Sequence, residues 1–147
     1  MLLRIRAVFP SDHGQWEALW LGYQTFYKTK IPAQTTEITW ARFFDSNEPM
    51  YALVAEEEGA LIGLVHYLFH RSTWTAGPYC YLQDLFTLET ARGKGVGRAL
   101  IEAVYAAANR EGASRVYWLT HETNAEARKL YDKVAQNLGF VQYRKDL

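Results

Sequence analysis

A glycine-rich segment near the middle of the chain is suited to binding a phosphate group. It has the sequence Arg92-Gly93-Lys94-Gly95-Val96-Gly97, follows a β-rich stretch and precedes residues with helical spacing. The first turn of a helix leaves backbone N–H groups unpaired, and the helix dipole favours negative charge there. Glycines let this backbone approach a phosphate because they carry no Cβ. We therefore expect an anion site on the backbone, with Lys94 and Arg98 either adding charge or forming a solvated basic loop.

Two common phosphate motifs do not fit this segment. The dinucleotide pattern G-x-G-x-x-G would need a glycine where Arg98 stands. The P-loop requires Ser or Thr after Gly-Lys, whereas Lys94 is followed by Gly95. The anion site is therefore of another kind.

Two residues of the second half are the main candidates for moving protons. Asp84 could accept one, directly or through water, whereas its neighbour Gln83 cannot, and alternation along a strand puts the two on opposite faces. Tyr131, with an unperturbed pKa of about 10, keeps its proton at neutral pH and could act as a proton donor. The alternative for Tyr131 is a core position on an amphipathic helix. His121 and Glu122 are weaker candidates for the base.

The remaining reactive residue types point to structural roles. Cys80 is the single cysteine, which excludes an intrachain disulfide or a CxxC metal site and favours a reducing compartment. A covalent intermediate on a cysteine would need an activating base, and no histidine is tied to Cys80 by a motif. His66 and His70 share one face of an extended segment, but two ligands are too few, so we expect no metal site.

Ten secondary-structure elements are expected to position these residues. Asp12 with Gln15, and Thr123 with Glu126, resemble capping boxes that open helices. The predicted order β-α-α-β-β-β-α-β-α-β indicates one α/β (mixed α+β) domain over residues 1–147, antiparallel in its first half. The strands are expected at residues 2–8, 51–56, 60–69, 79–88, 114–120 and 140–145. The helices are expected at 12–27 and 36–44, from after the glycine cluster 92–97 to Gly112, and at 123–138.

Composition limits the classes of partner. The 147 residues include 16 Lys plus Arg and 16 Asp plus Glu, so the formal net charge is zero. This balance argues against binding nucleic acid or a membrane surface by bulk charge. No stretch is long and apolar enough to span a bilayer, and the N-terminal segment has no secretory pattern, so we expect a cytoplasmic protein. Aromatic residues reach 15%, which suggests an aromatic-lined site or interface.

Two linked motifs resemble the GNAT N-acetyltransferase superfamily. Arg92, Gly95 and Gly97 match its coenzyme A motif, Q/R-x-x-G-x-G/A. A second signature, N-x-x-A-x-x-L-Y, is matched from Asn124 through Leu130 to Tyr131, and Gly139-Phe140 follow as in the family. The segment VYWLTHETN and its surroundings are similar to the branch that contains the yeast histone and polyamine acetyltransferases. The resemblance is strong over residues 79–145 and loose over residues 3–20.

This resemblance implies a fold, a cofactor and several roles. The fold would be a mostly antiparallel mixed sheet with a splayed central strand pair flanked by helices. Acetyl-CoA would enter the splay, and Tyr131 would protonate the departing sulfur, with direct transfer to a primary amine in a ternary complex. The residues implied in cofactor binding are Phe86, Thr87, Arg92, Gly93, Lys94, Gly95, Val96, Gly97, Arg98 and Asn124.

The acceptor and the partner are less closely defined. Aromatic faces with one or two carboxylates suit a cationic amine of a small molecule or peptide. We expect Tyr23, Tyr27, Trp74, Gln83 and Glu122 to shape its site. Polyamine-type relatives carry Glu-Asp where this chain has Gln83-Asp84, which leaves a coenzyme A-binding regulatory module without turnover as the alternative function. The resemblance also implies a homodimer that forms through residues 140–145.

Overall fold

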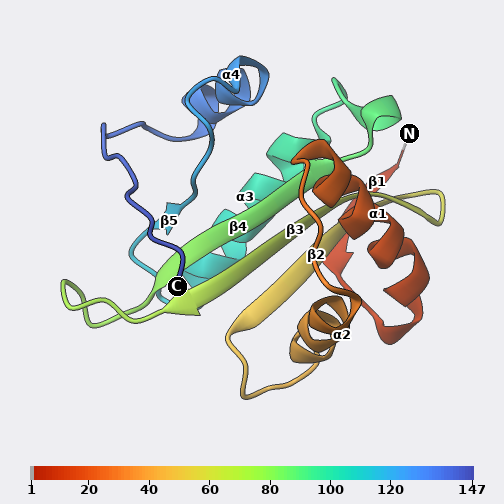
Figure 1. Ribbon diagram of the computed structural model, residues 1–147, viewed down its shortest axis with the longest axis horizontal. Helices are drawn as coiled ribbons and strands as arrows, with labels where there is room; N and C mark the ends of the chain where they lie inside the picture. The colour runs from red at the N-terminus through yellow and green to blue at the C-terminus, as the bar shows by residue number, and fades with distance from the viewer. Residues whose placement is uncertain (1) are drawn as a thin grey trace.

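The computed structural model describes residues 2–147 and shows a five-stranded mixed sheet with helices on both faces (Figure 1). The strands lie in the order β1-β2-β3-β4-β5, antiparallel except for the parallel pair β4 and β5. This confirms the expected mixed α/β fold. The elements are β1 (Leu3–Ala7), α1 (His13–Phe26), α2 (Ala33–Arg42), β2 (Met50–Glu57), β3 (Ala60–His70), β4 (Tyr79–Thr87), α3 (Val96–Arg110), β5 (Val116–Tyr117) and α4 (Ala125–Val134), with 3₁₀ turns at Pro10–Asp12 and Glu89–Ala91.

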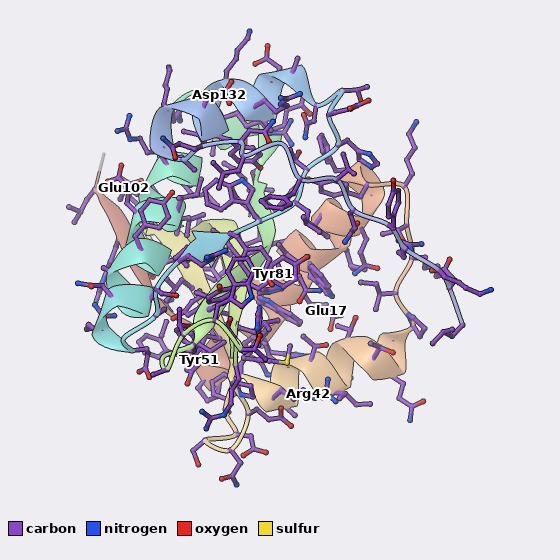
Figure 2. The ribbon with its side chains drawn as sticks, turned by 90° about the vertical axis from the view of Figure 1, so that its left-hand side faces the viewer. Glu17, Arg42, Tyr51, Tyr81, Glu102 and Asp132 are labelled. Atoms are coloured by element: carbon purple, nitrogen blue, oxygen red, sulfur yellow. The ribbon has the colours of Figure 1, made fainter. Side chains whose placement is uncertain are left out.

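Two apolar cores lie on opposite faces of the sheet. One face is covered by α1 and α2, with Trp16 and Leu64 fully buried. The other is covered by α3, which buries Leu100 and Val104 against β3 and β4. Figure 2 shows these two helical layers on either side of the sheet. Helix α4 lies beyond α3 near the end of the chain (Figure 1); it has no fully buried residue, but Leu130, Tyr131 and Val134 pack against the α3 core.

A β-bulge in β4 decides which side chains reach each layer. Leu82 pairs with Tyr67 and Asp84 pairs with His66, so Gln83 has no partner in β3. The extra residue shifts the alternation: Leu82 and Leu85 both contact the α3 core, whereas Phe86 belongs to the α1 core. The bulge therefore directs Asp84 toward α1.

Asp12 and Gln15 do not form the expected capping box of α1, because neither side chain caps that helix. Asp12 instead accepts the backbone N–H of Phe9 (2.7 Å) and a double hydrogen bond from Arg6 (2.7 and 3.0 Å). The Gln15 amide carbonyl accepts the N–H of Leu61 (2.9 Å) in the β2–β3 hairpin. Both side chains therefore join α1 to the sheet.

The last third of the chain departs most from expectation. Strand β5 is limited to Val116–Tyr117, helix α4 ends at Val134, and residues 140–145 form no strand. Helix α4 stops because Ala135 is extended, and Asn137 then accepts the N–H of Gly139 in a turn. Residues 140–145 have no ladder partner within residues 2–147, so their alternating apolar pattern has nothing to bury it. None of the helices described is long and apolar enough to cross a bilayer.

Candidate active site

Strands β4 and β5 separate soon after they pair. Their register is confined to Cys80 with Val116 and Tyr81 with Tyr117. Beyond Tyr81, β4 continues to Thr87 with no strand along that edge in the described part of the chain. This is the splayed pair that the sequence motifs imply, and two hollows form beside it, with Tyr27, Leu85 and Tyr131 lining both.

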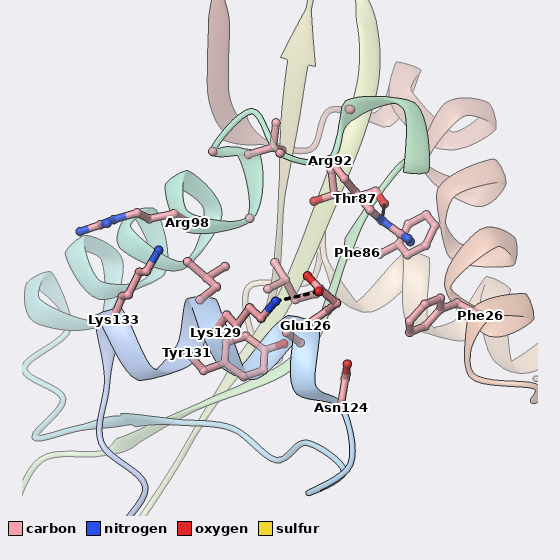
Figure 3. A pocket seen from close by; sticks show the side chains of 18 of the residues that line it. Phe26, Phe86, Thr87, Arg92, Arg98, Asn124, Glu126, Lys129, Tyr131 and Lys133 are labelled. Carbon is pink, nitrogen blue, oxygen red and sulfur yellow. Dashed lines mark hydrogen bonds and ion pairs between the residues drawn. The ribbon is translucent and has the colours of Figure 1, made fainter.

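The larger hollow is a groove of about 560 Å³ between the end of β4, the glycine loop, the first turn of α3 and helix α4 (Figure 3). All the residues expected to bind the cofactor line it except Lys94. The structure thus brings together segments from Phe86 to Asn124.

The glycine loop turns directly into α3. Gly93 and Gly95 both have φ of +80°, a left-handed conformation that favours glycine, and Gly95 is the N-cap of the helix. The N–H of Ala99 bonds back to the carbonyl of Gly95 (3.0 Å), so the three preceding N–H groups of the helix have no intrahelical partner. These backbone donors lie at the positive end of the helix dipole, and their residues line the groove. Both features suit the binding of a phosphate.

Arg92 takes a position that sequence reasoning did not anticipate. Its guanidinium lies over the ring of Phe26 at 5.3 Å, and its Nε donates to the carbonyl of Thr87 (3.3 Å). A ligand that pairs with the Thr87 carbonyl would displace this contact. Arg92 therefore closes one side of the groove by joining β4 to the end of α1.

Two lysines on α4, which the motifs did not single out, also line the groove. Lys129 and Lys133 are one helical turn apart, and Lys133 lies with Arg98 on the side away from Phe26 (Figure 3). Lys129 is paired with Glu126 (3.0 Å) and Arg98 with Glu102 (2.7 Å). The spacing of Lys129 and Lys133 beside the Leu130-Tyr131 signature was the available signal.

Tyr131 lies where the two hollows meet, since it lines both. Its ring contacts Trp118 edge-on, with centroids 5.4 Å apart. Burial, with a smaller contribution from Tyr27, raises the pKa of Tyr131 to about 12. The hydroxyl therefore keeps its proton across the neutral range.

The smaller hollow, about 70 Å³, lies between the separated strands and α1. Tyr23, Tyr27 and Gln83, three of the five residues that the sequence predicts for the acceptor site, line it. The structure does not bring the other two there. Trp74 is 80% exposed on the β3–β4 loop, and Glu122 is exposed beside the start of α4, where its backbone carbonyl accepts Arg128.

Asp84 lies behind this smaller hollow, which its own side chain does not line. Its Oδ2 is 3.0 Å from Nδ1 of His66. Burial, followed by the charge of Asp84 and a hydrogen bond to it, raises the pKa of Tyr23. The pKa of Tyr27 is raised by burial and then by the same charge. Asp84 therefore lies close to Tyr23 and Tyr27, two of the residues that line the smaller hollow.

Other candidates from the sequence are occupied elsewhere. Cys80 is fully buried, and burial raises the pKa of its thiol to about 12, which disfavours a reactive thiolate. His70 Nε2 lies 2.7 Å from the Tyr117 hydroxyl, and its Nδ1 lies 2.8 Å from the carbonyl of Arg71. Asn124 is the N-cap of α4, but its side chain makes only a long contact to Thr120 Oγ1 (3.5 Å).

Comparison with known proteins identifies the family. The acetyltransferase (GNAT) family profile matches residues 14–135. The chain is 40% identical over 144 residues to the D-amino-acid N-acetyltransferase HPA3 of Saccharomyces cerevisiae, covering 97% of this chain and 89% of the yeast protein. It is 33% identical over 155 residues to the thialysine N-epsilon-acetyltransferase of Mus musculus, covering 96% and 91%.

A solved structure shows the same fold at lower sequence identity. AAC(6')-Iy, in complex with the bisubstrate analogue CoA-S-monomethyl-acetylneamine, superposes with a TM-score of 0.87 at 16% identity, covering 100% of this chain and 99% of that one. The two motifs, the splayed strands and the relatives agree, and the chain belongs to the GNAT family of acetyltransferases.

Proposed function

We propose that this chain transfers the acetyl group of acetyl-CoA directly to a small primary amine. The observation that carries the proposal is the meeting of two hollows at Tyr131, one lined by a phosphate-binding backbone and the other by tyrosines backed by a carboxylate. A cofactor laid along the larger groove would bring its thioester to the end of the smaller one. The two substrates would then react without a covalent enzyme intermediate.

The cofactor residues divide by chemistry. The N–H groups of the loop and of the first turn of α3 would hold the pyrophosphate, and Arg98, Lys129 and Lys133 would add positive charge around it. The free edge of β4 near Phe86 would pair with the amide groups of the pantetheine arm as an added strand does. Acetyl-CoA would supply the activated thioester, and coenzyme A would leave as the thiol.

The acceptor amine must lose a proton before it can attack. An alkylamine has a pKa near 10 and is protonated at neutral pH. The Tyr23 hydroxyl accepts a proton from the ammonium group and passes its own to Asp84, so the carboxylate is the final acceptor of this relay. The amine nitrogen then forms a bond to the acetyl carbon, and the bond between that carbon and sulfur breaks.

Tyr131 would stabilise the departing sulfur. Its proton is present because burial raises its pKa to about 12, and it lies at the junction of the two hollows. A phenol of that pKa is a weaker acid than a free thiol of pKa about 8.5, so it acts chiefly as a hydrogen-bond donor to the thiolate unless the buried sulfur also becomes more basic. On forming the amide the nitrogen loses a second proton, which neutralises the thiolate. One proton is therefore released for each acetyl group transferred to an ammonium substrate.

A small acceptor suits the smaller hollow better than a long basic peptide. The space is about 70 Å³, and tyrosine faces with one carboxylate behind them match a single cationic group. The relatives are named for D-amino acids and thialysine, and AAC(6')-Iy binds an acetylneamine analogue. Each of these compounds presents a primary amine on a small molecule.

Release of free thiol from acetyl-CoA, measured with a panel of amines and with mass detection of the products, tests the proposal. The panel should contain D- and L-amino acids, thialysine, polyamines, aminoglycosides and histone peptides. Acetylation of a small amine supports the proposal. Binding of acetyl-CoA by calorimetry without turnover of any amine would favour a regulatory coenzyme A-binding module, and Gly95→Glu, which puts a carboxylate in the anion site, should abolish that binding.

We also propose that the chain forms a homodimer through residues 140–145. Phe140, Val141 and Tyr143 are 88%, 77% and 94% exposed, an apolar run of the kind that marks an interface. A second copy would supply the ladder partner that this segment lacks in a single chain.

A further inference from the structure

A buried histidine lies behind the acceptor hollow and joins it to the core. His66 is 4% exposed on β3, and the rings of Trp20 and Phe43 surround it at centroid distances of 4.8 and 5.0 Å. Its Nε2 lies 3.0 Å from the indole Nε1 of Trp16, and its Nδ1 lies 3.0 Å from Oδ2 of Asp84. Both ring nitrogens therefore have a single, specific partner.

These two contacts fix the protonation state of the imidazole. An indole N–H can only donate, so Nε2 of His66 must offer its lone pair to Trp16. The ring is then neutral, and its one proton resides on Nδ1, from which it is donated to the Asp84 carboxylate. Trp16 thus selects the tautomer and excludes the imidazolium.

We propose that Trp16 and His66 are positioning residues that hold Asp84 in place without cancelling its charge, so that the full negative charge is available to a cationic amine in the acceptor hollow. The inference rests on the proposed function and deepens it, since it assigns the ligand of the hollow as a primary ammonium group. An imidazolium at this position would form an ion pair with Asp84 and remove the attraction.

The surroundings of Asp84 support this assignment. The titratable groups that face Asp84 are Tyr23 on α1, Tyr27 at the C-terminal end of α1 and Tyr81 on β4. Burial is the largest cause that raises the pKa of each tyrosine, and the charge of Asp84 is the next. All three hydroxyls are therefore neutral at neutral pH. The groups that pack on His66 from α1 and from the end of α2 are the apolar rings of Trp16, Trp20 and Phe43.

The arrangement also explains the bulge at Gln83. A carboxylate buried without a cation is costly unless hydrogen bonds compensate it. The bulge brings Asp84 opposite His66 in the strand register, where Nδ1–H can supply such a bond. An arriving ammonium group would complete the compensation, which gives the site a preference for cationic over neutral acceptors.

The first test uses the unmodified protein. Nitrogen NMR of the protein labelled in its four histidines distinguishes the two neutral tautomers and the imidazolium, and His66→Asn identifies the signal. We expect His66 to be in the neutral Nδ1–H form at neutral pH, as its two hydrogen-bond partners require. An imidazolium, or a ring protonated on Nε2, would overturn the proposal even if no amine is acetylated, so this result is independent of the proposed function.

The second test removes the indole donor. In Trp16→Phe, Nε2 of His66 loses its indole donor and is free to bind a proton, so the acidic limb of kcat/KM for the amine should move to higher pH. The KM for acetyl-CoA should not change. Trp20→Phe is the matched control, because Trp20 is also buried and contacts the His66 ring, but its Nε1 has no hydrogen-bond partner.

These variants distinguish an effect of the charge at Asp84 from an effect of packing around His66. An equal shift in Trp16→Phe and Trp20→Phe, or no shift in either, would overturn the proposal. His66→Asn retains an N–H near the position of Nδ1 and should preserve more of kcat/KM than His66→Leu. Equal activity of the asparagine and leucine variants would show that the hydrogen bond to Asp84 does not matter for turnover.

Discussion

At the scale of single residues, Tyr131 carries the most direct prediction. Tyr131→Phe keeps the ring that contacts Trp118 but removes the hydroxyl at the junction of the two hollows. We expect kcat to fall by about 10²-fold, the lower range for a positioned proton donor, while coenzyme A affinity stays within about twofold. Steady-state kinetics and calorimetry measure the two quantities, and Tyr51→Phe on β2, away from both hollows, is the control.

The pH dependence of that reaction follows from the same residue. A pKa of about 12 means that Tyr131 retains its proton up to strongly alkaline pH, so its ionisation should not limit the rate below about pH 10. An alkaline limb near neutral pH that disappears in Tyr131→Phe would contradict this assignment.

A second residue-scale prediction concerns stability. The double hydrogen bond from Arg6, with burial opposing it, lowers the pKa of Asp12 below its usual value. A carboxyl group whose folded pKa is depressed stabilises the fold above its unfolded pKa of about 3.9, and this contribution is lost as pH falls through the folded pKa. Asp12→Asn should therefore cost about 1–3 kcal/mol at pH 7 and much less in strong acid.

Urea unfolding at the two pH values measures this difference, with Asp146→Asn as the control. Asp146 pairs with Arg144 but is exposed near the end of the chain, where ion pairs contribute little. If the loss in free energy of unfolding caused by Asp12→Asn does not change with pH, then the shape of the Asp12 side chain, and not its charge, sets its contribution to stability.

At the scale of elements, the glycine loop and α3 could be predicted because their chemistry is local. Gly95 needs no distant partner to open a helix, so its position follows from the sequence. The bulge at Gln83 could not be predicted in the same way, since it exists only in register with β3. The position of Trp74, which does not line the smaller hollow, could not be predicted for a related reason, since the sequence does not say which way the loop between β3 and β4 turns.

Helix α4 carries the element-scale prediction. It brings Lys129 and Lys133 to the groove, where they would attract the phosphates of the cofactor. The double substitution of both lysines by alanine should raise KM for acetyl-CoA by about 3- to 10-fold, with a smaller effect at high salt because exposed charges are screened. Lys30→Ala changes an exposed lysine outside the groove and should leave KM unchanged. If the double variant lowers kcat but does not raise KM for acetyl-CoA, the proposed role of Lys129 and Lys133 is contradicted.

At the scale of the whole molecule, the structure shows where the charged and aromatic residues counted in the sequence lie. The chain needs no global positive charge to bind an anion, because the loop, Arg98 and the two α4 lysines gather donors at one groove. Many of the aromatic residues either belong to the α1 core, which includes Trp16, or are tyrosines that line the smaller hollow, where we propose that the acceptor binds. Total composition could not distinguish these two uses, because both require rings on the same helix.

The exposed apolar segment carries the last prediction. If residues 140–145 of two copies bury each other, sedimentation at micromolar concentration should show a dimer, and Phe140→Asp should shift it to monomer because a charge there opposes burial. Glu126→Asp, an exposed substitution on α4 away from this segment, is the control variant and is prepared in the same way. A wild-type protein that sediments as a monomer at every concentration would rule the interface out, and the exposed rings of Phe140 and Tyr143 would then need another partner to cover them.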